Sequence, residues 1–280
     1  MSFLTKDLGK MKDLFKFSEQ PEFENPTLIV AWQEDAGKLS PRVIDYINKK
    51  LRGRSFCEIE PVGFFSLEGV AIEKDTAQFP EGRFYCSERR DLVIFKGNEP
   101  RFERHKFLNA ISDLAQHYCK IQELYTIGGT ISPIAHTGSR RILAVFNQSE
   151  IQQELSGHGL KNMNWQGPPA MSSYLLWIAK KRAVRGVSLW TEIPLYLAPG
   201  EDFQAMKTTL SFLDRKFSLA LDFTELDEEI KGQNMKIDRL RQQDQEIDRC
   251  IRMLESELSL SGEEQLELTK KVAEALEERD

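Results

Sequence analysis

The chain has 280 residues, of which 40% are hydrophobic and 29% charged, an ordinary composition for a globular protein with a full core. No apolar run approaches the roughly 18 residues that cross a membrane, and the charged N-terminal segment lacks the apolar block of a signal peptide. We therefore expect a cytoplasmic protein without a membrane partner. The four cysteines form no C-x-x-C pair, so we expect free, mostly buried thiols.

The net charge of −6 is unevenly distributed along the chain. Residues 222–280 carry 18 acidic and nine basic side chains, a net charge of −9, so the rest of the chain is slightly basic at +3. The basic clusters at residues 89–90, 101–106 and 180–185 are short, and we interpret each as solvated surface. Because nucleic-acid binding favours a basic patch, we expect no nucleic-acid partner.

The first predicted elements are a helix, a strand and a second helix. Leu4, Leu8, Met11 and Phe15 fall at helical spacing and predict an amphipathic N-terminal helix within residues 1–20. The apolar run at residues 27–32 predicts a strand that is buried on both faces. Ser40-Pro41 then predicts the start of a helix that ends near residue 51.

Strand and helix signals alternate from there to residue 220. Strands are predicted at residues 55–59, 69–73, 83–86, 91–95, 124–127, 141–146 and 186–190. Helices are predicted at about residues 102–115, 149–155, 169–178 and 201–219. This alternation predicts an α/β domain over residues 21–220, with a mainly parallel sheet covered by helices.

The C-terminal segment, residues 222–280, has a different pattern. Eleven positions over residues 223–258 are spaced alternately three and four apart, and nine of them are apolar, which predicts an acidic heptad helix. Gln233 and Asp244 interrupt the seam, and Ser261-Gly262 separates it from a short second helix. We therefore expect a coiled-coil or helical-hairpin extension.

The apolar seam of this extension needs a partner. The partner is the second helix, the α/β body or the same helix of another subunit, and we favour the last because homo-oligomers are common. The residues expected at the oligomer contact are Leu226, Ile230, Ile237, Leu240, Ile247, Ile251, Leu254 and Leu258.

Strong catalytic motifs are missing, and the four histidines lack metal-ligand spacing, so we expect no catalytic residues, metal or cofactor. The segment 128–141 is nevertheless chemically capable. Paired Gly128 and Gly129 let backbone N–H groups approach a ligand, and five side chains suit an anion: Thr130, Ser132, His136, Arg140 and Arg141. The alternative is a glycine-permitted turn with a hydrogen-bonded histidine.

Two other loops carry candidate residues. Glu34 and Asp35 follow the first strand as possible general bases, although we expect them to lie in a solvated loop. Asn98 and Glu99 follow the strand at residues 91–95 and are expected to line the same cleft, because the carboxyl ends of parallel strands share one edge. The alternative for the second pair is a helix-capping turn.

Several of these segments together carry a family resemblance. The segments are Pro26-Thr-Leu-Ile-Val-Ala-Trp32, Phe64-Phe-Ser-Leu-Glu-Gly69, Asp91-Leu-Val-Ile-Phe-Lys-Gly-Asn-Glu-Pro100, Gly128-Gly-Thr130 with Pro133 and His136-Thr137, and Gly167-Pro-Pro-Ala-Met-Ser-Ser-Tyr-Leu-Leu176. In this order they resemble the proteasome assembly chaperone family over about residues 20–220, specifically relatives of the second eukaryotic chaperone and their archaeal and bacterial homologues. The resemblance implies an α/β fold similar to that of nucleoside phosphorylases, homo-oligomeric rings or clusters, and a protein client.

Two features depart from the family pattern. Of the glycine-rich loop that usually follows the first strand, residues 33–37 keep only Gly37, so a ligand loop is not expected there. Proteasome-docking relatives end in a hydrophobic–tyrosine–any tripeptide, whereas this sequence ends in Glu278-Arg279-Asp280, so docking by that route is not expected.

The leading interpretation is a non-catalytic, protein-binding, assembly-chaperone-like homo-oligomer. One alternative is an enzyme or binding protein for a small anionic or nucleoside-like ligand, which uses the segment 128–141. A third is a structural scaffold that presents acidic helices.

Overall fold

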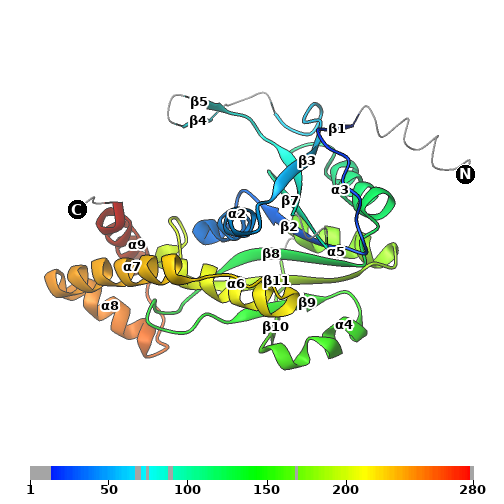
Figure 1. The fold of residues 1–280 in the computed structure, drawn as a ribbon. Helices are drawn as coiled ribbons and strands as arrows, with labels where there is room; N and C mark the ends of the chain where they lie inside the picture. The colour runs from blue at the N-terminus through cyan, green and yellow to red at the C-terminus, as the bar shows by residue number, and fades with distance from the viewer. Residues whose placement is uncertain (1–13, 67–70, 74–75, 88–90, 168–169, 278–280) are drawn as a thin grey trace, which may run out of the picture.

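The computed structural model describes residues 14–66, 71–73, 76–87, 91–167 and 170–277. Its centre is a nine-stranded sheet (Figure 1). The strands are β1 (Phe15–Phe17), β2 (Thr27–Trp32), β3 (Arg54–Ile59), β6 (Gly82–Cys86), β7 (Leu92–Gly97), β8 (Glu123–Ser132), β9 (Ile142–Phe146), β10 (Lys161–Asn162) and β11 (Arg185–Pro194). Their order across the sheet is β1-β3-β6-β7-β2-β8-β11-β9-β10.

The sheet is mixed, and its parallel part lies in the middle. Strands β7, β2, β8 and β11 run parallel to one another. On one side β1, β3, β6 and β7 pair antiparallel in turn, and on the other side β9 pairs antiparallel with β11 and parallel with β10. The predicted α/β architecture is confirmed, and the parallel sheet is confirmed for its central strands. The edge strands β6 and β7 are joined by a short connection, and such a connection allows antiparallel pairing alone.

Helices cover both faces of the sheet. They are α2 (Leu39–Leu51), α3 (Arg104–Asp113) with its π-helical continuation η2 (Leu114–Cys119), α4 (Ser149–Glu154), α5 (Met171–Lys181) and α6 (Phe203–Phe217). One core cluster joins α2, α4 and α6 to the sheet, and the other joins α3, η2 and α5 to the opposite face. In strand β2, Ile29 belongs to the first cluster, whereas Leu28 and Val30 belong to the second. The prediction of a strand buried on both faces is therefore confirmed.

The predicted N-terminal helix lies mostly outside the described residues. In the part that is described, Phe15–Phe17 form the edge strand β1 and pair antiparallel with β3, so the helix prediction is wrong there. Phe15 is buried, and the Phe17 ring lies 5.1 Å from the ring of Tyr118 in η2. Pairing with an open strand edge and packing of these rings outweigh the local helical spacing.

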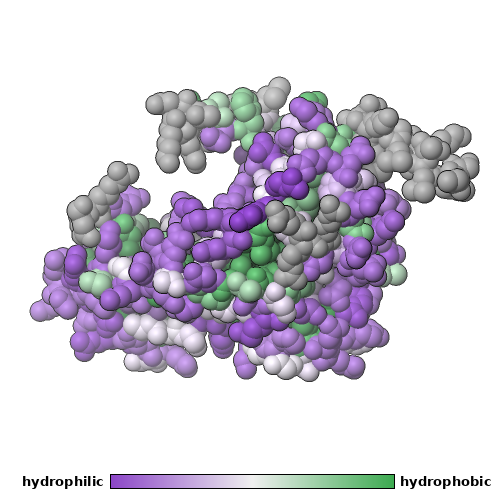
Figure 2. All heavy atoms as spheres, in the orientation of Figure 1, coloured by the Kyte–Doolittle hydropathy of each residue, from purple (hydrophilic) through white to green (hydrophobic). Residues whose placement is uncertain are grey.

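A small hairpin projects from the body of the molecule. Strands β4 (Ala71–Glu73) and β5 (Thr76–Gln78) form their own two-stranded sheet, which we call the arm together with Phe79. The arm stands clear of the central sheet in Figure 1, and Figure 2 shows apolar residues on it. Ile72 is 74% exposed and Phe79 is 69% exposed. The strand predicted at residues 69–73 therefore belongs to the arm and not to the main sheet.

The C-terminal tail consists of α7 (Thr224–Gln243), α8 (Gln245–Glu255) and α9 (Gly262–Glu277). The prediction of one continuous heptad helix is wrong, because the backbone at Asp244 is extended, with φ −129° and ψ 105°. The Asp244 carboxylate accepts hydrogen bonds from the backbone N–H groups of Glu246 and Ile247 and so begins α8 as its N-cap. Helix α8 then runs back beneath α7 (Figure 1).

Most of the predicted seam is buried within the chain. Leu226, Ile237, Ile247, Ile251 and Leu254 belong to the same core cluster as Leu268 and Val272 of α9 and residues of α6 and β11. Ile230 and Leu240 pack against this cluster, whereas Leu258 is 55% exposed. The polar interruption Gln233 is buried and donates to the Glu201 carbonyl at 2.7 Å, so it joins α7 to the body. The seam therefore packs against the chain's own helices.

The cysteines are free and buried at all four positions, as the sequence predicts. Burial raises the pKa of Cys57 to about 12, which keeps this thiol protonated at neutral pH.

In the part of the chain that the structure describes, no helix combines the length and the apolar character that a membrane crossing requires.

Candidate functional site

The four central strands end at one edge of the sheet, which we call the carboxyl edge. Here the loop after β2 meets the end of β8. Helix α2, which follows β2, covers one face of the sheet, and α3, which follows the neighbouring strand β7, covers the other. Open α/β sheets bind ligands where their connections diverge in this way. Whether a crevice for a small molecule is open here depends on the residues where the loop after β2 contacts the end of β8.

Asp35 closes this crevice. One oxygen, Oδ1, accepts the Gly129 N–H at 2.9 Å, and the other, Oδ2, accepts the Ser40 N–H at 2.8 Å and lies 2.5 Å from Ser40 Oγ. Ser40 Oγ in turn lies 2.8 Å from the Ile127 carbonyl oxygen. Burial raises the pKa of Asp35. The expectation of a solvated loop is thus wrong for Asp35, whose carboxyl group links the β2 loop, α2 and β8.

The paired glycines allow the chain to pack closely against itself. A Cβ atom on Gly129 would lie 2.5 Å from the backbone oxygen of Ala36 in the 3₁₀ turn η1 (Ala36–Lys38), and one on Gly128 would lie 2.9 Å from the Trp190 ring. Strand β8 also continues through Ser132, so the predicted loop is a strand at its first residues, Thr130 included. The close backbone approach that the sequence predicts for a ligand is made by Ala36.

His136 is buried against η4 (Leu195–Leu197). Its backbone N–H donates to Tyr196 Oη at 2.5 Å, and its Nδ1 atom lies 2.8 Å from the same hydroxyl. Burial lowers the pKa of His136 to about 4, so the imidazole is neutral at neutral pH. These contacts match the alternative of a hydrogen-bonded histidine.

Arg140 forms a buried ion pair. Its Nε donates to Asp202 Oδ2 at 2.7 Å, and the two side chains are 1% and 0% exposed. The Arg140 Nη1 group also donates to the carbonyls of Ala135, His136 and Gly138, and Asp202 is the N-cap of α6. Arg140 thus joins the turn after β8 to the start of α6.

The loops after β2 and β7 meet, as the sequence predicts for strands that share a carboxyl edge. Asn98 Nδ2 donates to Glu34 Oε1 at 2.7 Å, and the Glu99 N–H donates to Glu34 Oε2 at 3.2 Å. Burial, and then the charge of Glu34, raises the pKa of Glu99. Within the described residues, no group of three or more His, Cys, Asp or Glu side chains is placed to hold a metal ion.

A polar groove of about 600 Å³ lies between α2 and the base of the arm. Its lining residues are Gln33, Lys38, Pro41, Arg42, Asp45, Gln78, Phe79, Pro80, Glu81, Lys96 and Asn98. Lys96 Nζ pairs with Asp45 at 2.6 Å, and Arg42 pairs with Glu201. Lys38 is exposed and forms no ion pair with any described residue. Among the described residues, this groove is open polar space beside the carboxyl edge, whereas Gly129, His136 and Arg140 of the segment 128–141 are engaged within the protein.

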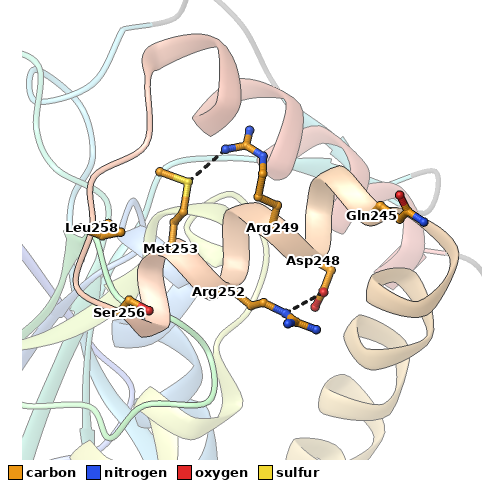
Figure 3. Close-up of a pocket in the computed structure, with 7 residues that line it drawn as sticks. All are labelled: Gln245, Asp248, Arg249, Arg252, Met253, Ser256 and Leu258. Carbon is orange, nitrogen blue, oxygen red and sulfur yellow. Dashed lines mark hydrogen bonds and ion pairs between the residues drawn. The ribbon is translucent and has the colours of Figure 1, made fainter.

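A second hollow, of about 450 Å³, lies on the outer side of α8 (Figure 3). All of its lining residues come from α8 and the three residues after it, and Figure 3 shows Arg252 turned toward Asp248 and Arg249 toward Met253. Arg252 Nε lies 2.8 Å from Asp248, and Arg249 pairs with Glu246 and Glu264 at 2.6 Å. Because these cations already have partners, this hollow is part of the tail surface.

Exposed aromatic residues gather where α3 packs against α5. Tyr174 is 47% exposed and Trp177 46%, and we call these two residues of α5, together with the exposed His105 of α3, the aromatic face. The His105 ring lies 6.4 Å from Trp177, and Lys181 Nζ lies 3.9 Å above the Trp177 ring. Sequence reasoning missed this face. The signal was present, because Tyr174, Trp177 and Lys181 recur at helical spacing opposite the buried side of α5.

Comparison with known proteins places this α/β chain in a family. The sequence pattern of the PAC2 family matches residues 28–241, and the chain belongs to the PAC2 family. The match covers the body and nearly all of α7. A search of curated proteins found no match.

Solved structures with the same fold come from archaea and bacteria. The archaeal proteasome activator PbaB of Pyrococcus furiosus has 22% identity and a TM-score of 0.66, covering 81% of this chain and 98% of its own. A proteasome-assembly chaperone homologue of Mycobacterium tuberculosis has 14% identity and a TM-score of 0.69, with 80% and 99% covered. A Corynebacterium glutamicum protein of unknown function has 17% identity and a TM-score of 0.74, with 87% and 96% covered. The predicted resemblance to proteasome assembly chaperones is confirmed.

Proposed function

We propose that this PAC2 protein is a non-catalytic, assembly-chaperone-like protein that binds other protein chains in the cytoplasm and acts as a homo-oligomer. Its family and the names of two of its structural neighbours support a protein partner. The closure of the crevice at the carboxyl edge by Asp35 and Ala36 weighs against a small-molecule reaction at that point.

The exposed apolar arm is the observation that carries this proposal. Ile72 and Phe79 are 74% and 69% exposed on a hairpin that stands clear of the body. A two-stranded hairpin is marginally stable by itself, and exposed apolar surface rimmed by polar residues marks protein interaction sites. The groove at the base of the arm supplies such a rim, with Arg42, Glu81 and Lys96 among its polar residues. Protein interfaces have this arrangement of an apolar centre and a polar border.

Site-specific photo-crosslinking in the native cell tests the proposal. A photo-reactive amino acid replaces Ile72, and a matched probe replaces Val145, which is 38% exposed on β9. We expect the probe at position 72 to crosslink the subunits of one multi-subunit assembly, identified by mass spectrometry, and the probe at position 145 to crosslink far less. Equal labelling from the two positions contradicts a client contact at the arm. Purified client is then expected to lose affinity for the Ile72→Ser variant.

The groove favours a second candidate function, the binding of a small anionic or nucleoside-like ligand. A volume of about 600 Å³ falls within the roughly 300–1,000 Å³ typical of small-molecule sites. Because His136 and Arg140 are engaged inside the protein, such a ligand would meet Lys38 and Asn98. Thermal-shift measurements with phosphate, nucleosides and nucleotides test this function. Binding raises the melting temperature of the wild type but not of Lys38→Ala, and no shift with any of these ligands counts against it.

A further inference from the structure

The molecule carries surfaces of opposite charge at its two ends. The aromatic face on α3 and α5 lies at one end, and the tail lies at the other (Figure 1). Residues 155–191, which include α5, contain five basic side chains and no acidic one, whereas residues 222–280 have a net charge of −9. Hydrophilic residues cover most of the visible face of the tail (Figure 2).

We propose that the aromatic face of one copy of this chain binds the outer side of helix α9 in a second copy. The inference rests on the homo-oligomer part of the proposed function and names the two surfaces that form the oligomer. Because the surfaces differ, the contact is heterologous, and its repetition closes into a ring when the rotation between copies permits.

The aromatic face offers apolar rings beside positive charges. Lys180 and Lys181 are exposed one turn after Trp177 on α5, and Lys181 lies over its ring. Arg182 Nη1 pairs with Asp113 at 2.6 Å, which holds α5 against α3. The face is therefore fixed in position before a partner arrives, which reduces the entropy lost on binding.

The outer side of α9 offers the complementary pattern. Leu268 and Val272 face the core, whereas Leu266 is 73% exposed on the opposite side. Glu263 and Glu274 are exposed before and after this leucine, as is Lys270, and Glu274 also borders the groove that α9 shares with Lys236 and Arg239 of α7. An exposed leucine on a helix with two exposed glutamates complements a surface that combines aromatic rings with lysines.

The contact has to join two molecules. Helices α5 and α9 occupy opposite ends of the structure, so the aromatic face cannot reach the tail of its own chain (Figure 1). Every copy presents both surfaces at the same concentration, and opposite charges speed their encounter and orient it. A basic aromatic surface also suits single-stranded nucleic acid, but an acidic tail on every copy competes for the face and repels phosphate.

A charge-swap experiment tests this interface. Sedimentation velocity is measured on the full-length wild type, on Lys180→Glu/Lys181→Glu, on Glu263→Lys/Glu274→Lys, and on the variant that carries all four changes. We expect an oligomer for the wild type, at least tenfold weaker association for each double variant, and recovery in the fourfold variant. Because all four side chains are exposed, circular dichroism and melting temperature are expected to stay unchanged. Weaker wild-type association at high salt is also expected.

Three results would overturn the inference, and they can be told apart. A wild type that is monomeric at every concentration removes the homo-oligomer part of the proposed function as well. A wild-type oligomer that neither double variant weakens removes only this interface. An unaltered oligomer together with single-stranded oligonucleotide binding that Lys180→Glu/Lys181→Glu abolishes assigns the aromatic face to nucleic acid. Loss of association in Trp177→Ser and in Leu266→Ser gives independent support.

Discussion

The carboxyl edge of the sheet and the outer surface of the molecule differ in whether their most conspicuous side chains are buried with partners or exposed. At the carboxyl edge, His136 and Arg140 look like ligand-binding groups, yet each has partners inside the protein. On the outer surface, Ile72 and Trp177 look like core residues, yet each is exposed. A polar group inside a protein needs a partner, whereas an apolar group in water has none within its own chain. The surface that still lacks a partner is therefore apolar, and the burial of apolar surface favours a protein as that partner.

The largest expected effect concerns the buried ion pair. Arg140→Met leaves the Asp202 carboxylate buried without its cation, and breaking a buried pair in this way costs about 3–5 kcal/mol. The matched control is Arg42→Met, whose partner Glu201 adjoins Asp202 but whose own side chain is 52% exposed, so the loss there is below about 1 kcal/mol. Urea unfolding measures both. If Arg140→Met is as stable as Arg42→Met, Arg140 is free to act as a ligand-binding group.

The next effect concerns the contact between β8 and the loop after β2. Gly129→Ala places a Cβ atom 2.5 Å from the Ala36 carbonyl oxygen, and relieving such overpacking costs about 1–3 kcal/mol. Gly138→Ala is the control, because its nearest atom would lie 3.4 Å away. Thermal melts of the two variants compare them directly. A Gly129→Ala protein with wild-type stability would show that the crevice has room to open.

The acid dependence of stability comes third, and the contribution of His136 to it has a definite sign. The folded-state pKa of about 4 is below the ordinary value of 6.5, so over this range the unfolded chain binds a proton that the folded chain does not. Stability is therefore lost as pH falls from 6.5 toward 4, by at most about 1.4 kcal/mol per pH unit. Urea unfolding at pH 7 and pH 5 is expected to show a smaller loss for His136→Gln than for the wild type. Equal losses would place His136 in contact with water.

Local patterns were enough to predict much of the body. The apolar run at residues 27–32 is β2. Ser40-Pro41 lies in the first turn of α2, although the helix begins at Leu39, two residues before the start predicted at Pro41, and its N-cap is Lys38 instead of Ser40. Shared strand direction also predicted that Asn98 and Glu99 meet the loop after β2. These features depend only on residues close in sequence or on the rule that parallel strands end at one edge, so they can be predicted from one sequence.

Contacts between distant segments were not predictable in the same way. The bond from Gly129 to Asp35 spans 94 positions, and nothing near either residue indicates the other. Asp244 looked like a polar interruption of a heptad, but it ends α7 because its carboxylate caps α8 and pairs with Lys271 of α9 at 2.6 Å. An N-cap and a seam position use the same residue type, and only the fold of the tail distinguishes them.

The smallest expected effect on stability is at the arm. Because little stability is lost there, a change in binding tests most directly whether the exposed outer surface is an interface. Ile72→Ser removes an apolar side chain that is 74% exposed, so the free energy of unfolding is expected to change by less than about 0.5 kcal/mol. The control Ala77→Ser alters an exposed residue of the neighbouring strand while removing little apolar surface. We expect client binding to fall in Ile72→Ser and to persist in Ala77→Ser, measured by light scattering of the purified complex. A residue that contributes little to folding but much to binding lies on an interface. If Ile72→Ser instead destabilised the protein by several kcal/mol, the arm would be packed against the body, and the contrast between a closed edge and an open surface would fail.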